Sequence, residues 1–321
     1  MIKLLLFFMS LEGKIKKADT GKSTAGKNSA DTNVERTFAA LQKRVEPYRA
    51  EASRPSTAGR INAGVRTPAY LMNYAFDNTV GFGIAKYQDY AAKKYLKKNP
   101  KTTKHIRYLM HGSLGNRGSQ WKLASQINKS GDIAVHLGAL HYLGPKKVAD
   151  KAFDQINRLQ EEVKLEEPYK RRDSLSGHSS GAVVGKYMAG DKRILQYGLT
   201  EGVQARGPTP YGIGGRRLTL AQRLILPFAK ADDTRTDLGK RNAAELATIK
   251  PLVPVHVIAG EYDALVPPAD TVYGHAKTHK VIRGPIGTHL AMSGGHRKVN
   301  EIYINELAGY SKNKYKYEKA A

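Results

Sequence analysis

The sequence predicts an α/β fold, with a mostly parallel central sheet flanked by helices, a small helical cap and a flexible N-terminal arm. Strand-like segments alternate with helical ones through most of the chain, and such alternation is typical of a parallel sheet covered on both faces. A G-x-S-x-G motif also lies between a short extended run and an apolar helical segment. The 321 residues are enough to bury a sizeable core in one large domain.

Composition shifts divide the chain into parts. The first part is rich in Lys, Ser, Thr, Ala and Gly and has too little apolar surface to fold alone. An aromatic-rich stretch follows and predicts one or two helices, broken near Gly81 and Gly83. The predicted parts are a flexible basic arm (1–64), a helical prelude packed on the core (65–103), the main domain (104–310) with a cap insertion at 202–250, and a basic tail (311–321).

Within the main domain, apolar runs and helical periodicity define the elements. The predicted strands are Ile106–Met110, Asp132–Leu137, residues 171–176, Ile194–Leu199, Leu252–Ala259 and a run around Val281–Ile282. The predicted helices are Trp121–Asn128, Val148–Leu165, the segment after Ser179, and Val299–Leu307. The insertion between the last two long strands is where a lid would lie.

The charge balance favours acidic partners. Lys and Arg number 53 against 28 Asp and Glu, a net charge of +25. Such a surface attracts anionic lipid, nucleic acid or an anionic substrate. Zinc-finger, RNP-like and basic-zipper patterns are missing from the sequence, so we expect no specific nucleic-acid partner, whereas an anionic membrane surface is a possible one. The alternative is a solvated surface, because the lysines are dispersed.

The first residues contain a short apolar run, MIKLLLFFMSL, that resembles the start of a signal peptide. Glu12-Gly13-Lys14 follows where a small-residue cleavage site should be. We therefore expect a cytoplasmic protein, with Met9 as an alternative start; secretion or association with a membrane surface is the alternative. The sequence has no cysteine, which excludes disulfides and thiolate metal sites.

The motif Gly177-His178-Ser179-Ser180-Gly181 makes Ser179 the candidate nucleophile. A sharp strand-to-helix turn holds a serine hydroxyl away from its neighbours, and small residues two before and two after it let backbones pass closely. The new helix also directs free N–H groups at developing negative charge. We interpret His178 as a packing residue.

A serine nucleophile needs an orienting acid and a base. Asp263 follows a buried strand and is the candidate acid; Glu261 and Asp233 are reserves, and a simple turn role for Asp263 is the alternative. His289, in a glycine-containing loop beyond the acid, is the candidate base, with His296 as its rival.

Two backbone N–H groups are candidates for an oxyanion hole, which stabilises negative charge on the substrate oxygen. One belongs to Ser180, the residue after the nucleophile. The other belongs to Ser113, in the loop His111-Gly112-Ser113-Leu114-Gly115 that follows an early strand.

Four pieces in this order resemble the α/β-hydrolase family: His111-Gly112, the G-x-S-x-G motif, Gly260-Glu261-Tyr262-Asp263 and Gly287-Thr288-His289-Leu290. The resemblance covers roughly residues 104–308. It implies an eight-stranded sheet, a cap after the sixth strand and activity as an esterase, lipase, thioesterase or related hydrolase, without a cofactor. Two features depart from the pattern: the strand before Ser179 is unusually polar, and the loop after Val135 lacks an Asp-x-x-Gly-x-Gly turn.

The sequence therefore predicts a serine hydrolase that cleaves a small-molecule or lipid carboxylic ester through an acyl-enzyme, with Ser179, Asp263 and His289 as its triad. One alternative is a thioesterase or acyltransferase that uses the same triad. Another is a catalytically silent protein that binds anionic membrane or nucleic acid. We expect no cofactor or metal, and the oligomeric state stays open.

Overall fold

In the computed structural model, the sheet and its helices belong to the unit formed by residues 37–321. The residues that the structure describes are Val34, Arg36, Thr37, Ala39, Ala40, 57–113, 115–139, 144–207, 237–263, Val266, Thr271, Tyr273, 275–284 and 286–305. The predicted C-terminal tail and most of the predicted arm lie outside them.

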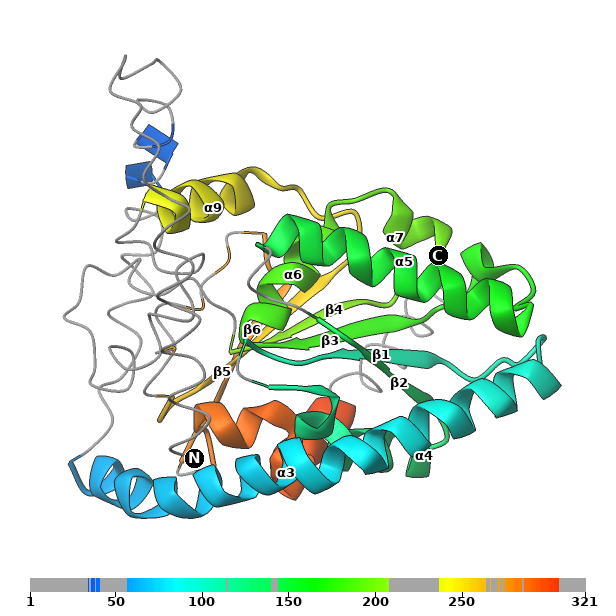
Figure 1. Ribbon diagram of the computed structural model, residues 1–321. Helices are drawn as coiled ribbons and strands as arrows, with labels where there is room; N and C mark the ends of the chain where they lie inside the picture. The colour runs from blue at the N-terminus through cyan, green and yellow to red at the C-terminus, as the bar shows by residue number, and fades with distance from the viewer. Residues whose placement is uncertain are drawn as a thin grey trace, which may run out of the picture. The chain divides into compact units, whose positions relative to one another are not determined.

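A six-stranded sheet forms the centre of the described fold, with the strand order β2-β1-β3-β4-β5-β6. Every neighbouring pair is parallel, so the carboxyl ends of all strands meet at one edge (Figure 1). The strands are β1 (Ile106–Met110), β2 (Ile133–Leu137), β3 (Ser174–His178), β4 (Gly202–Arg206), β5 (Val255–Gly260) and β6 (Thr278–Ile282). In the described part of the chain the sheet thus has six strands instead of the expected eight.

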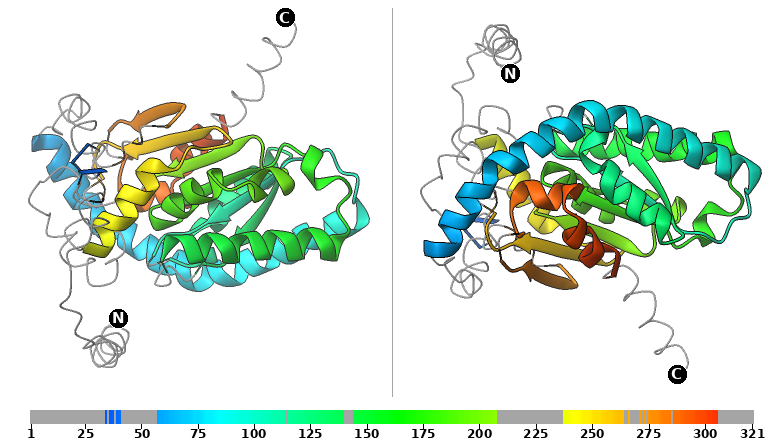
Figure 2. Two further views of the ribbon diagram at one scale, coloured as in Figure 1. Left: turned by 90° about the horizontal axis from the view of Figure 1, so that it is seen from above. Right: turned by 90° about the horizontal axis from the view of Figure 1, so that it is seen from below.

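Helices cover both faces of the sheet (Figures 1 and 2). One face carries α5 (Pro145–Val163), α6 (Ser180–Ala189), α7 (Arg193–Gln196) and α9 (Asp237–Thr248). The other carries α3 (Thr57–Lys98), α4 (Trp121–Lys129) and a helix over 297–305. Shorter turns are the 3₁₀ helices η1 (Arg117–Gln120) and η3 (Pro168–Lys170) and the π-helix η7 (Ala291–Gly295). The predicted α/β architecture is confirmed.

The alternation of side chains along the strands builds a separate core on each face. In β1, Tyr108 and Met110 belong to the cluster that includes α5 and α6, whereas Leu109 between them belongs to the cluster with α4 and the helix over 297–305. Successive side chains of a strand point to opposite faces, so a strand buried on both faces is apolar except where its polar side chains are hydrogen-bonded.

The polar residues of β3 are buried in pairs. Arg107 Nη1 donates to Ser174 Oγ at 3.0 Å, and Ser176 Oγ donates to Gln204 Oε1 at 2.8 Å. A buried polar group costs little once it is hydrogen-bonded. This explains how an unusually polar strand occupies the middle of the sheet.

The strand predicted over 194–199 is wrong. Those residues begin in the short helix α7, where the Asp191 carboxylate accepts the backbone N–H of Arg193 at 2.9 Å and favours a helical turn. The strand is β4 instead, inside the region predicted as an insertion. Gln204 and Arg206 make the sequence of β4 look like a polar segment, although both side chains are buried. Of the rest of the predicted cap, residues 237–248 form α9, and residues 208–236 lie outside the described residues.

The predicted break near Gly81 and Gly83 is also wrong, because α3 runs unbroken for 42 residues. Gly81 permits a close approach: a Cβ there would lie 2.4 Å from Cδ1 of Trp121 and 2.9 Å from the carbonyl oxygen of Gly118. At Gly83 a Cβ would meet nothing within 4 Å. Despite the length of α3, neither it nor another described helix has the long apolar stretch that crossing a membrane requires.

These two glycines predict opposite effects of the same substitution. Gly83→Ala should stabilise the fold by roughly 1 kcal/mol, because alanine loses less backbone entropy in a helix. Gly81→Ala should destabilise it by at least about 2 kcal/mol, because Trp121 must move. Urea denaturation of both variants checks the prediction, and similar shifts at the two positions would contradict it.

A lysine is buried in α6. Lys186 is 1% exposed, and its Nζ lies 4.7 Å from the centroid of the Tyr273 ring. Desolvation disfavours the charged form and lowers the pKa of Lys186 to about 7 from the ordinary 10.5. Between these values the unfolded chain binds more protons than the folded chain, so this group makes stability rise with pH there.

Replacing Lys186 by methionine should therefore stabilise the protein in a pH-dependent way. We expect a gain on the order of 3 kcal/mol in the free energy of unfolding at and below pH 7, shrinking as the pH approaches 10. Denaturant titrations of wild type and Lys186→Met at pH 6, 8 and 10 measure it. If the gain in the free energy of unfolding were the same at all three pH values, burial would not lower the pKa of Lys186.

Candidate active site

The turn between β3 and α6 holds Ser179 in a strained conformation. Its φ is 55° and its ψ is −123°, on the positive-φ side that non-glycine residues rarely adopt. Its N–H donates to the carbonyl of Arg206 at 2.9 Å, and its own carbonyl accepts the N–H of Ala182 at 2.9 Å. Bonds on both sides of the residue thus fix the strained turn.

The glycines of the motif are required by backbone contacts. A Cβ at Gly177 would lie 2.3 Å from the carbonyl oxygen of Gly181, and a Cβ at Gly181 would lie 2.5 Å from that of His111. Outside the motif, a Cβ at Gly112 would lie 2.9 Å from the Cβ of Ser179. The end of β1 and the turn between β3 and α6, which we call the elbow turn, therefore touch through their backbones.

The predicted acid and base are hydrogen-bonded to each other. His289 Nδ1 lies 2.8 Å from Asp263 Oδ2, and both side chains are buried. The other oxygen of Asp263, Oδ1, accepts the N–H of Val266 at 2.8 Å. Because a carboxylate oxygen accepts hydrogen bonds, Nδ1 of His289 is the donor in this contact and its Nε2 faces away from Asp263.

His178 contacts the predicted base directly. The two imidazole rings lie 4.6 Å apart between centroids, and His178 Nε2 donates to the carbonyl of His289 at 3.0 Å. Burial, together with the charges of His289 and Arg206, holds the pKa of His178 well below its usual value. His178 is therefore a neutral side chain that links the serine turn to the loop of His289, more than the packing residue we expected.

The end of β4 completes this edge of the sheet. Gly207 has a φ of +50°, and a Cβ there would lie 3.3 Å from Asp263 Oδ2 and 3.5 Å from His289 Nδ1. The backbone carbonyl of its neighbour Arg206 accepts the N–H of Ser179. The sequence analysis did not identify Arg206 or Gly207 as site residues. The feature that could have indicated them is a glycine directly after a strand, at the sheet edge where Asp263 and Ser179 also lie.

Ser180 and Ser113 are close together. Ser113 Oγ donates to Ser180 Oγ at 2.7 Å. Ser180 is the first residue of α6, where N–H groups lack partners within the helix and the helix dipole favours negative charge. Gly115 N–H bonds the carbonyl of Gly112 at 3.0 Å and closes the turn that contains Ser113. Leu114 lies outside the described residues.

Helix α3 holds this loop from outside. The N–H of Asn116 donates to Asn78 Oδ1 at 2.8 Å, and Asn116 Nδ2 donates to the carbonyl of Asn78 at 2.7 Å. His111, the first residue of this loop, is buried. Burial lowers its pKa to about 4, so the side chain is neutral near pH 7. Its Nδ1 donates to the carbonyl of Gly112 at 2.8 Å.

The reserve residues lie elsewhere. Glu261 Oε2 accepts the N–H of Gly284 at 2.7 Å and so serves a turn. His296 follows η7, whereas the carboxylate of Asp263 bonds His289. Asp233 lies outside the described residues.

The order of these features along the sheet is decisive. A serine stands on a strained turn between a central parallel strand and a helix, an aspartate follows β5, and a histidine follows β6. The chain has an α/β-hydrolase fold. That assignment rests on the sheet order and the elbow turn.

Comparison with solved structures finds proteins of this fold class. Esterase B from Lactobacillus rhamnosis is 14% identical, with 68% of this chain and 80% of that chain covered and a TM-score of 0.47. Esterases from the fungus Rhizomucor miehei give 13% identity, 68% and 78% coverage and a TM-score of 0.49. An arylesterase is 14% identical, with 66% of this chain and 77% of that chain covered and a TM-score of 0.44. Neither a protein-family model nor a curated protein matches the sequence.

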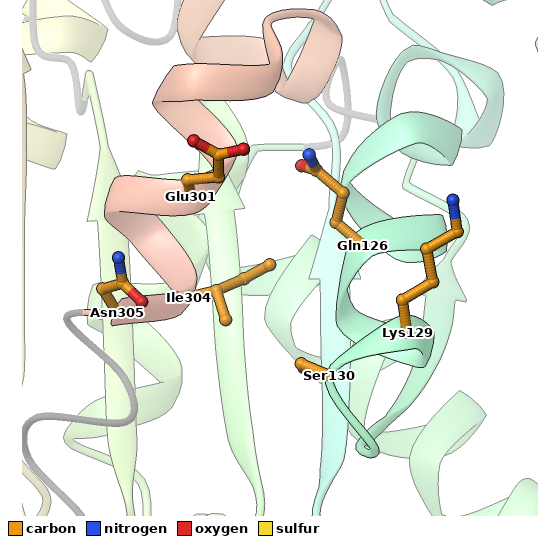
Figure 3. Close-up of a pocket in the computed structure, with 6 residues that line it drawn as sticks. All are labelled: Gln126, Lys129, Ser130, Glu301, Ile304 and Asn305. Atoms are coloured by element: carbon orange, nitrogen blue, oxygen red, sulfur yellow. The ribbon is translucent and has the colours of Figure 1, made fainter.

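One pocket is lined by residues other than those at the edge with Ser179, Asp263 and His289. This pocket lies between α4 and the helix over 297–305 (Figure 3), and its volume is about 240 Å³. Its lining residues, none of which is a predicted site residue, are Gln126, Lys129, Ser130, Glu301, Ile304 and Asn305. Within the described ranges, no group of three or more His, Asp or Glu side chains could hold a metal ion.

The backbone contacts predict that Gly181→Ala is costly. The added methyl would press on the carbonyl oxygens of His111 and Met110, and these backbones cannot move apart without distorting β1. We expect a loss of roughly 2–4 kcal/mol in the free energy of unfolding, measured by urea denaturation. The control is Ser180→Ala, one residue away, which removes a hydrogen bond and should cost about 1 kcal/mol. Equal costs would contradict the packing argument.

Proposed function

We propose that the protein is a serine hydrolase that cleaves a carboxylic ester through an acyl-enzyme, with Ser179 as nucleophile, His289 as base and Asp263 as acid. The observation that supports this most is the 2.8 Å bond between His289 and Asp263 at the sheet edge that also carries the strained Ser179. A serine, a histidine and a carboxylate in these roles are a recurrent arrangement for acyl transfer.

In the first half of the proposed reaction, Ser179 Oγ attacks the ester carbonyl carbon while its proton passes to Nε2 of His289. The imidazolium gains stability from the Asp263 carboxylate on its other nitrogen. When the tetrahedral intermediate collapses, the bond from carbon to the alcohol oxygen breaks. His289 gives its proton to that oxygen, which leaves an acyl group on Ser179.

In the second half, a water molecule takes the place of the alcohol. His289 removes a proton from the water as its oxygen attacks the acyl carbon, and the bond to Ser179 Oγ then breaks. His289 returns the proton to Oγ, and the carboxylic acid leaves. The pairing with Asp263 keeps the imidazole in the tautomer that both halves need.

Negative charge forms on the carbonyl oxygen in both halves. We assign its stabilisation to the backbone N–H groups of Ser180 and Ser113. The position of Ser180 at the start of α6 and the 2.7 Å contact between the two serine hydroxyls support this assignment. Such preorganised donors are typically worth about 3 kcal/mol each in the transition state.

A serine-directed fluorophosphonate probe tests the proposal. Wild type should be labelled, Ser179→Ala should not, and Asp263→Asn should lose about 10³–10⁴ in kcat on nitrophenyl esters. Ser130→Ala changes a serine in the pocket of Figure 3 and should keep full labelling and activity.

A folded wild type that the probe leaves unlabelled would exclude this function. A panel of nitrophenyl esters of different acyl length, compared with thioesters and with alcohols as acyl acceptors, then separates ester hydrolysis from thioester hydrolysis and acyl transfer. Faster turnover of thioesters than of matched esters would contradict the ester assignment.

A further inference from the structure

Helix α3 carries most of the exposed apolar side chains in the described part of the chain. Ten large apolar residues there are exposed, and six of them lie on α3, between half and three-quarters accessible. They are Leu71, Met72, Phe76, Val80, Tyr87 and Tyr90. Scattered exposed apolar residues are ordinary, but a concentration on one element marks an interaction surface.

Five of them form one continuous face, which we call the α3 stripe: Met72, Phe76, Val80, Tyr87 and Tyr90. Their spacing of four, four, seven and three residues keeps them on one side of a helix. The opposite side packs on the fold through buried Asp77, Gly81, Ala85, Ala92 and Leu96. The stripe is therefore the outward face of α3, which runs along the outside of its layer (Figure 2).

The charges on α3 are sorted in the same way. Its acids turn inward: Asp77 accepts from Trp121 Nε1 at 2.8 Å, and Asp89 lies 3.1 Å from Arg117 Nη1. The exposed charged side chains that the structure describes on α3 are all lysines, namely Lys86, Lys94, Lys97 and Lys98. The outward face thus combines large apolar groups with lysines, of which Lys97 is paired with Glu162 of α5 at 3.1 Å.

We propose that the α3 stripe binds an anionic lipid surface, with the helix lying in the plane of the interface. The apolar side chains enter the boundary between head groups and acyl chains, and the lysines pair with lipid phosphates. This is a binding function for the positive charge of the chain, independent of the proposed hydrolysis.

Other occupants fit the stripe less well. A second copy of the chain would bring lysines against lysines, between two molecules that each carry a net charge of +25. A nucleic acid would pair with the lysines but leave Met72, Phe76 and Val80 without an apolar partner. A lipid surface satisfies both components of the stripe.

Helix α3, which carries the α3 stripe, is also bonded to the loop of Ser113 beside the elbow turn. Asn78, on the inner side of α3 between Phe76 and Val80, bonds Asn116 next to the loop of Ser113. The proposed lipid surface and the contact with the loop of Ser113 thus lie on opposite sides of the same helix.

Vesicle sedimentation with the full-length protein tests the proposal. Wild type should bind vesicles of phosphatidylglycerol and phosphatidylcholine, bind pure phosphatidylcholine much more weakly, and lose binding as NaCl rises from 0.05 to 0.5 M. The triple variant Met72→Ser, Phe76→Ser, Val80→Ser should bind the anionic vesicles at least about tenfold more weakly. Thermal melting confirms that it is folded.

The matched control is Tyr169→Ser with Leu195→Ser, which removes exposed apolar groups elsewhere and should bind as wild type does. Ser179→Ala should also bind fully, so failure of the proposed catalysis and failure of this surface are distinguishable. Absence of binding to anionic vesicles would overturn the proposal. So would binding that the folded triple variant retains, or a stripe-dependent dimer of the wild type that excludes vesicles.

Discussion

Direct contact between backbones at the end of β3 is the constraint on which the site depends. Gly177 and Gly181 have no room for a side chain, because the carbonyl oxygens of Gly181 and His111 would lie only 2.3 and 2.5 Å from an added Cβ. This proximity lets the chain reverse direction within one residue, and Ser179 takes the resulting strain at a φ of 55°. Arg206 contacts this turn directly, and the loop of His289 contacts it through His178.

A buried polar layer supports the turn from the side. His178 joins β3 to the loop of His289, and Arg206 joins β4 both to Ser179 and, through Nη1 at 2.9 Å, to the carbonyl of Met292. Arg206 is fully buried, and desolvation lowers its pKa to about 10, so it stays charged near neutral pH. Buried polar groups of this kind are costly unless they are bonded, and here their bonds run between the segments that carry the proposed triad.

The sequence allowed prediction of the groups that chemistry specifies and of the strands that apolar runs mark. Asp263 and His289 were chosen for their chain order after Ser179, and the structure joins them at 2.8 Å. Strand β4 was missed because Gln204 and Arg206 interrupt its apolar pattern, and only tertiary partners explain their burial. The unbroken α3 was missed because Gly81 serves a contact with Trp121 that is distant in sequence. The roles of the triad, the cap and the partners stay predictions.

The separation of the interacting residues along the chain affects biosynthesis. His178 touches a histidine 111 positions further on, and the parallel sheet between them forms only through long crossovers. A polypeptide still emerging from the ribosome therefore carries the turn of Ser179 well before the loop of His289 has been made. The contacts that fix this edge of the sheet form only after nearly the whole chain has been translated.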